Sequence, residues 1–131
     1  MNICLCSSQN SFESCCKPYL EGTQHAPTAE ALMRSRYAAY VLHKVDYLMK
    51  TTHPSQLKFH SKEETLRWAV SNQWLKLEIL NATQDTVEFK AYFIGPTLKN
   101  QIHHEKSTFK LNNDRWFYVD GVFYGSISLT V

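Results

Sequence analysis

The order of apolar and polar residues divides the chain into a helical half and a half made of strands. Thr28 can start a helix, because a threonine hydroxyl at this position accepts a hydrogen bond from the first turn. No Gly or Pro follows before Pro54, and apolar side chains recur at the spacing of one helix face: Met33, Tyr37, Tyr40, Val41 and Leu48. The pattern therefore predicts one amphipathic helix of about six turns between Thr28 and Thr52.

A second, shorter helix is predicted after Pro54. Ser61 and Glu64 have the spacing of a capping box, in which both side chains accept hydrogen bonds from backbone N–H groups at a helix start. We expect this helix to run from Ser61 to about Asn72.

From Trp74 onward the apolar residues recur with a period of two, which is typical of strands with one buried face. The short connections between these segments favour an antiparallel meander. The fold class is therefore α+β, with two N-terminal helices packed on one face of a curved antiparallel sheet. The expected strands are 74–80, 87–93, 101–111, 115–120 and, past Gly121, 122–131.

The composition is that of an ordered globular protein. The chain has 131 residues, of which 44% are hydrophobic and 20% are charged. This length is typical of a single domain, and this composition excludes low-complexity and disordered chains. The formal net charge of +2 is too small for the basic footprint of a nucleic-acid-binding domain, so nucleic acid is not an expected partner.

The N-terminal residues have neither the basic start nor the apolar stretch of a secretory signal. No apolar run is long enough to span a membrane. We therefore expect a cytoplasmic protein that has no membrane partner.

The four cysteines of the chain all lie near its start, at Cys4, Cys6, Cys15 and Cys16. In a reducing compartment such a cluster indicates a metal site or a redox pair, and incidental free thiols are the third alternative. A disulfide between the adjacent Cys15 and Cys16 would be strained, which disfavours the redox pair. Four thiolates complete a tetrahedral Zn²⁺ site with no open position for a substrate, so we predict that these cysteines bind a structural Zn²⁺.

The cysteine segment resembles the SEC-C zinc motif of the SecA translocation ATPase, and the rest of the chain is similar to bacterial YchJ-type proteins. The resemblance implies a zinc knuckle with its linker at residues 1–22 and a cone-shaped domain of the nuclear-transport-factor-2-like fold at residues 23–131. The similarity to the YchJ type rests on Lys17–Leu20, Ala26–Glu30, Leu32–Tyr37, Thr52–Pro54, Trp74–Leu75, His104–Glu105 and Trp116–Gly121.

The knuckle departs from the SEC-C pattern at two places. Leu5 replaces the proline that usually separates the first two cysteines, and Ser7-Ser8-Gln9-Asn10 replaces a Gly-Ser-Gly-Lys run. Because glycine adopts positive φ easily, we expect this loop to be built differently here. The interaction surface that the glycine-lysine tip provides is also expected to differ.

On the strand at 101–111, Phe109 and Leu111 define the buried face. The period of two then places Ser107, Glu105 and His103 on the same face. A carboxylate that points toward the helix-covered side of a sheet is unusual, because burial of an unpaired charge is costly.

Two interpretations of Glu105 remain. In the first, Glu105 pairs with Arg34 or Arg36 of the first helix and joins that helix to the sheet, with Tyr37 and Ser107 as neighbouring polar groups. In the second, which enzymes of the nuclear-transport-factor-2-like fold imply, Glu105 is a general base in an open cone and His103 or Tyr40 is its proton partner. We expect the ion pair.

The strand pattern places several aromatic residues on the outer sheet face. An exposed aromatic patch there would support a homodimer, unless the C-terminal strand covers it. The residues concerned are Trp74, Tyr92, Trp116 and Tyr118. The histidines at 53, 60, 103 and 104 lack metal-ligand spacing, and we expect most of them to be solvated.

Two functions follow from these features. The preferred one is a non-catalytic binding or adaptor module, in which the zinc knuckle docks a partner protein. The alternative is a small-molecule-binding protein or enzyme that uses the cone pocket around Glu105.

Overall fold

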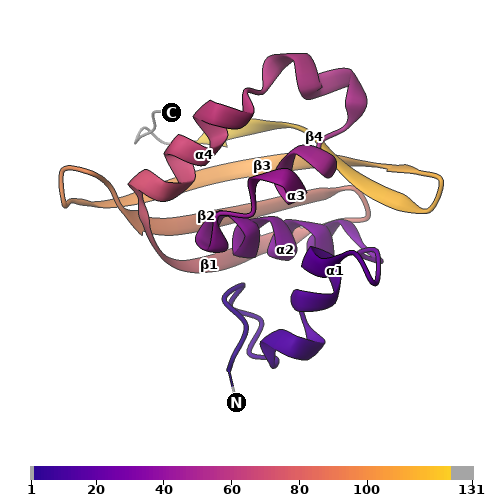
Figure 1. Cartoon of the computed structure of the whole chain (residues 1–131), viewed down its shortest axis with the longest axis horizontal. Coiled ribbons are helices and arrows are strands. Elements are labelled where there is room, and N and C mark those ends of the chain that lie inside the picture. The colour runs from indigo at the N-terminus through magenta and orange to yellow at the C-terminus, as the bar shows by residue number, and fades with distance from the viewer. Residues whose placement is uncertain (1, 125–131) are drawn as a thin grey trace.

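The structure is a computed structural model, and it describes residues 2–124. Four antiparallel strands form a single sheet in the order β1-β2-β3-β4, and the helices pack on one of its faces (Figure 1), which confirms the predicted α+β class. The elements are η1 (Phe12–Ser14), α1 (Lys17–Glu21), α2 (Ala29–Leu42), α3 (Val45–Lys50), η2 (Pro54–Phe59), α4 (Lys62–Ser71), β1 (Gln73–Ala82), β2 (Thr86–Ile94), β3 (Asn100–Asn112) and β4 (Arg115–Tyr124).

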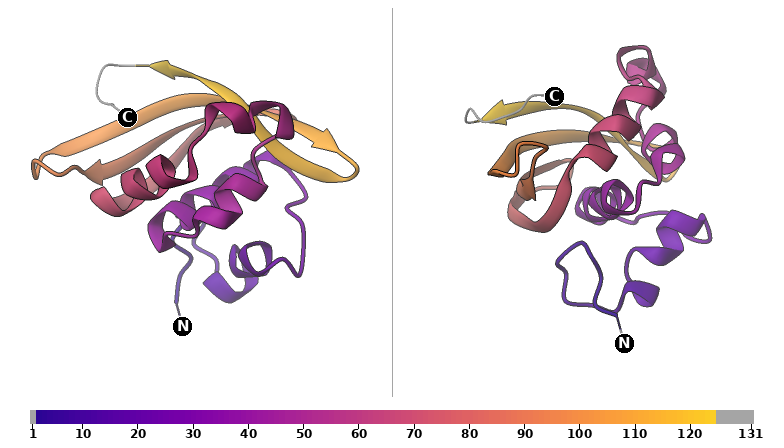
Figure 2. Two further views of the ribbon diagram at one scale, coloured as in Figure 1. Left: turned by 45° about the horizontal axis from the view of Figure 1, so that its top comes forward. Right: turned by 60° about the vertical axis from the view of Figure 1, so that its left-hand side comes forward.

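The main core lies between α2 and the concave face of the sheet, which curves around the helices (Figure 2). Val87, Phe89 and Ala91 alternate along β2 and are all buried, as expected for a central strand with one covered face. Leu32 and Met33 of α2 pack against them. In the described part of the chain, no helix has the length and hydropathy that crossing a bilayer requires.

The two predicted helix starts are confirmed by their caps. The Thr28 hydroxyl accepts a hydrogen bond from the Ala31 N–H at 3.0 Å, and the Ser61 hydroxyl accepts one from the Glu64 N–H at 3.2 Å. Each cap satisfies one of the backbone donors that a helix start leaves open.

The prediction of one long helix up to Thr52 is wrong, because the chain turns at His43. His43 has φ of 61° and ends α2, and the Lys44 N–H donates back to the Ala39 carbonyl at 2.8 Å. This is the left-handed helix end that glycine usually provides. The chain then starts α3 at Val45, which packs beside α2.

The last strand also differs from the prediction. β4 runs without a break from Arg115 to Tyr124, so Gly121 lies inside a strand and does not separate two strands. The remainder of the predicted fifth strand, 125–131, lies outside the described residues.

Three aromatic side chains predicted to face outward point inward instead. Trp74 is turned inward by a β-bulge, because the register shifts between Trp74 and Lys76 in β1. Trp116 and Tyr118 pair with Leu111 and Phe109 across the β3–β4 hairpin and so lie on the covered face. All three pack against the main core. Tyr92 does lie on the outer face, where its hydroxyl donates to Glu78 at 2.6 Å.

Candidate functional site

The four cysteine sulfurs lie within 4.8 Å of one another, and Cys4, Cys6 and Cys16 are buried. The Sγ–Sγ separations are 3.6 Å for Cys6–Cys15 and 4.0 Å for Cys15–Cys16. Four sulfurs bound to a tetrahedral zinc ion at about 2.3 Å would lie about 3.8 Å apart. The set therefore fits a tetrahedral metal ion, and it leaves no coordination position for a substrate.

The thiols differ in acidity. Hydrogen bonds from Cys16 and Cys4 lower the pKa of Cys6, whereas hydrogen bonds with Cys4 and Cys6, together with burial, raise the pKa of Cys16. The hydrogen bonds of the cluster therefore favour the thiolate form of Cys6. Binding of a metal ion would displace the protons held by the other thiols.

The loop between the cysteine pairs keeps the backbone that glycines normally provide. Ser7 and Gln9 have φ of 68° and 74°, and they occupy the places of the two glycines in the SEC-C pattern. The expectation that this loop is built differently is therefore wrong for its backbone. The Cys4 N–H donates to the Asn10 carbonyl at 2.7 Å and closes the loop.

Gln9→Gly is expected to raise the free energy of unfolding by about 0.5–1 kcal/mol, because the left-handed backbone costs a non-glycine residue more than glycine loses in entropy. Urea unfolding of the two proteins measures the change. Asn10→Gly is the matched control, because Asn10 has no positive φ. An equal effect of both substitutions would contradict the strain argument.

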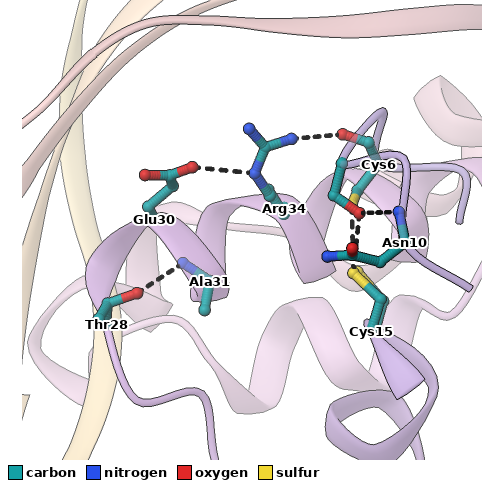
Figure 3. Close-up of polar contacts among 9 residues, drawn as sticks. Cys6, Asn10, Cys15, Thr28, Glu30, Ala31 and Arg34 are labelled. Atoms are coloured by element: carbon teal, nitrogen blue, oxygen red, sulfur yellow. Dashed lines mark hydrogen bonds and ion pairs between the residues drawn. The ribbon is translucent and has the colours of Figure 1, made fainter. Parts of the chain in front are cut away.

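Arg34 fixes the cysteine knuckle, here residues 2–16, to α2 (Figure 3). Its Nη1 donates to the Cys6 carbonyl at 2.8 Å, and its Nε donates to Glu30 at 3.0 Å. On the other side of the knuckle, the Ser7 hydroxyl accepts a hydrogen bond from the Leu77 N–H of β1 at 3.1 Å. The cluster is thus bonded to both layers of the domain, and Arg34 serves the knuckle rather than Glu105.

A second candidate site is a pocket of about 440 Å³ between the helices and the sheet. Most of its walls are aromatic or aliphatic, and a few polar groups converge on it, as in small-molecule sites. The residues that line it are Met33, Arg36, Tyr37, Tyr40, His60, Trp68, Trp74, Phe89, Ala91, His103, Glu105, Ser107, Tyr118 and Phe123.

Glu105 lies in the wall of this pocket and is only 5% exposed. Its Oε1 accepts a hydrogen bond from His103 Nε2 at 2.7 Å, and its Oε2 accepts from Ser107 and Tyr118 hydroxyls, each at 2.8 Å. Three donors thus satisfy the carboxylate without an arginine or lysine.

The expected ion pair with an arginine is wrong. Between residues 2 and 124, Glu105 forms no ion pair with Arg34 or Arg36. Arg34 is held by the knuckle, and the Nη1 of Arg36 donates to the Leu48 carbonyl of α3 at 3.0 Å and to the Thr51 hydroxyl at 2.7 Å. His103, Glu105 and Ser107 share the pocket side of β3, as predicted, and Phe109 is buried beside them. Leu111, which was also expected on the buried face, is 48% exposed near the end of the strand.

Tyr118 contacts both the Arg36 guanidinium and the Glu105 carboxylate. Its backbone pairs with the end of the α3 segment, through Thr51 and His53, and its ring lies 4.6 Å below the Arg36 guanidinium. Burial and the nearby Glu105 raise the pKa of Tyr118, so its hydroxyl stays protonated and donates to Glu105. Burial also raises the pKa of Tyr40, although Arg36 acts in the opposite direction.

The histidines are less solvated than expected, because all four are half-buried. His60 and His103 line the pocket, whereas His104 bonds to Glu88 at 2.8 Å on β2. Burial and Arg36 lower the pKa of His60, which favours a neutral imidazole there.

Gly121 is a site residue that the sequence reasoning missed. A Cβ at this position would lie 2.6 Å from Cδ and 2.7 Å from Cγ of Glu105, closer than real Cβ contacts. Gly121 pairs with Ser107 across the sheet. The missing side chain of Gly121 leaves the space in which the Glu105 carboxylate lies. A glycine inside a strand pattern is the signal that could have found it.

Gly121→Ala is expected to displace the Glu105 side chain and to lower the free energy of unfolding by about 2–3 kcal/mol, because the added methyl group overpacks a buried site. Thermal unfolding measures the loss. Gly95→Ala is the control, since its Cβ would meet the flexible Gln101 amide at 3.3 Å. Similar melting temperatures for both variants would contradict this role of Gly121.

A four-cysteine knuckle docked on a helix-covered antiparallel sheet defines a nuclear-transport-factor-2-like protein with an N-terminal SEC-C-type motif. Residues 28–121 match the family described as YchJ, middle NTF2-like domain. The chain belongs to this family, as the sequence resemblance implied.

Similar proteins cover most of this chain. A UPF0225 protein of Geobacter sulfurreducens is 39% identical over 92% of this chain and 78% of its own length. A UPF0225 protein of Haemophilus influenzae is 42% identical over 89% of this chain and 76% of its own length. The solution structure of a SEC-C motif containing protein from Rhodopseudomonas palustris matches with a TM-score of 0.86 and 36% identity, covering 95% of this chain and 100% of that chain. The crystal structure of a SEC-C motif containing protein from Psychrobacter arcticus matches with a TM-score of 0.77 and 31% identity. This match covers 98% of this chain and 86% of that chain.

Proposed function

We propose that the chain binds a small organic molecule in the pocket around Glu105 and that His103 exchanges a proton with it. The observation that carries this proposal is the buried Glu105 carboxylate, which lines a pocket of about 440 Å³ and bonds to His103, with no arginine or lysine in salt-bridge contact in residues 2–124. A buried polar network beside an aromatic cavity is typical of ligand and catalytic sites.

The hydrogen bonds assign a different role to each member of the network. His103 donates from Nε2 to Glu105, so the Nδ1 of the neutral ring is the atom that can accept a proton. Both Glu105 oxygens are engaged, and the carboxylate therefore orients the imidazole and stabilises its charged form. Ser107 and Tyr118 hold the carboxylate in place. The reaction class is proton transfer to or from a bound organic ligand.

The test is a screen of small aromatic and alicyclic compounds by NMR. Trp68 and Trp74 line the pocket, whereas the Trp116 indole donates to the Pro27 carbonyl outside it. Ligands of the pocket are expected to shift the indole signals of Trp68 and Trp74 and to leave that of Trp116 unchanged. A broad screen without such a ligand would overturn the proposal.

For the knuckle, we propose that the bound metal is a structural Zn²⁺ held by Cys4, Cys6, Cys15 and Cys16 in a reducing cytoplasm. Four thiolates are the donor set that zinc prefers in structural sites. Metal analysis of protein purified without chelator is expected to give one zinc per chain. A stoichiometry near zero with freely titratable thiols would contradict this.

A partner protein on the knuckle is the second candidate function. Ile3 is 61% exposed and Leu5 is 40% exposed, so the knuckle presents apolar surface to solvent. The double substitution of Ile3 and Leu5 by serine leaves the metal ligands in place. If the knuckle docks a partner, proteins captured by the wild-type chain should be lost from this variant; identical capture by both would contradict the adaptor function.

A further inference from the structure

Arg36 carries a buried charge that forms no direct ion pair with a carboxylate among the described residues. Its side chain lines the pocket, and the residue is only 6% exposed. Its Nη1 donates to the Leu48 carbonyl and to the Thr51 and Thr52 hydroxyls. The Tyr40 hydroxyl also lies in hydrogen-bonding contact with the guanidinium. Within residues 2–124, no carboxylate is in salt-bridge contact with Arg36.

This arrangement is costly without a further partner. Burial of a guanidinium is unfavourable unless an anion or a full set of acceptors replaces water. The ring of Tyr118 below the guanidinium compensates only part of the charge, because a cation–π contact is weaker than a charged hydrogen bond. Glu105 lines the same pocket but does not contact the guanidinium directly, since its oxygens accept from His103, Ser107 and Tyr118.

We infer that Arg36 is the anchor for an anionic group of the ligand, and that the pocket binds a small planar organic carboxylate. This inference rests on the proposed function, and it names the chemical class of the ligand. The guanidinium presents its N–H groups in a plane, which matches the two oxygens of a carboxylate.

The rest of the pocket fits the body of such a molecule. Trp68 and Trp74 pack edge to face at 5.0 Å, and Phe89 and Tyr37 complete an aromatic wall. A flat apolar ring system can bury its faces against this wall. With its carboxylate on Arg36, the ligand presents its remaining atoms to His103, which lines the same pocket.

The test compares naphthoate with its neutral amide, naphthamide, which have the same shape and differ in charge. Isothermal titration is expected to show at least tenfold tighter binding of naphthoate to the wild-type chain. NMR should show shifts of the Trp68 and Trp74 indoles. Arg36→Met should abolish the preference, whereas Arg67→Met, which removes the same charge from an exposed position on α4, should retain it.

The outcomes separate this inference from the proposed function. Equal binding of the two probes in the pocket of the wild-type chain would overturn the anion anchor and leave the proposed function standing. Binding of neither probe would also overturn the anchor, and the broader screen then decides the proposed function independently. The comparison on the wild-type chain needs no variant, so it holds even if Arg36→Met does not fold.

Discussion

Glu105→Ala is expected to lower the free energy of unfolding by about 3–5 kcal/mol, because the substitution leaves buried donors without an acceptor at roughly 1–3 kcal/mol each. The donors are His103 Nε2 and the hydroxyls of Ser107 and Tyr118. Gly121 provides no side chain to fill the space that the carboxylate vacates. Urea unfolding of the variant measures the loss.

Glu105→Gln is the matched control. The glutamine oxygen can accept from Ser107 and Tyr118, and its amide can donate to Nε2 of His103 once the ring carries its proton on Nδ1. The free energy of unfolding of the variant is therefore expected to fall by less than about 1 kcal/mol. The variant still lacks the negative charge of Glu105, and Nδ1 of His103 can no longer accept a proton. A loss as large as that of Glu105→Ala would show that the negative charge itself holds the site together.

Cys6→Ser is expected to abolish metal binding and to lower the free energy of unfolding by more than about 3 kcal/mol, because structural metal binding contributes directly to folding. Cys6 is completely buried, and its carbonyl is the acceptor for Arg34, so loss of the cluster also loosens the knuckle from α2. Treatment of the wild-type chain with a strong chelator should give a similar decrease in melting temperature.

Ser14→Ala is the control for the knuckle, because its exposed hydroxyl donates only to the nearby Ser11 carbonyl in the described structure. This variant should keep the metal and the wild-type melting temperature. A Cys6→Ser protein that melts like the wild type, together with a chelator that has no effect, would contradict a structural role for the cluster.

The sequence predicted the features that depend on local rules. Thr28 and Ser61 are caps, and the period of two on β3 correctly placed Glu105 on the covered face. The helix end at His43 was missed because no glycine marks the left-handed position. The bulges at Trp74 and Thr108 were missed because a simple alternation assumes an unbroken register.

The partner of Glu105 was not predictable from sequence spacing. Both arginines lie on the expected helix, but Arg34 reaches the Cys6 carbonyl and Arg36 reaches the Leu48 carbonyl. Those acceptors exist only because the knuckle docks on α2 and because the chain turns at His43 to form α3. Tyr118 became a partner of Glu105 because it pairs with Phe109 and therefore lies on the same covered face as Glu105.

The most direct test of the pocket proposal is a parallel titration of the wild-type chain and Glu105→Gln with the ligands that the NMR screen finds. The account predicts that these ligands shift the Trp68 and Trp74 indoles of the wild type and bind at least tenfold more weakly to Glu105→Gln, while both proteins melt at similar temperatures. Equal affinity for the two proteins, or shifts confined to Trp116, would contradict it.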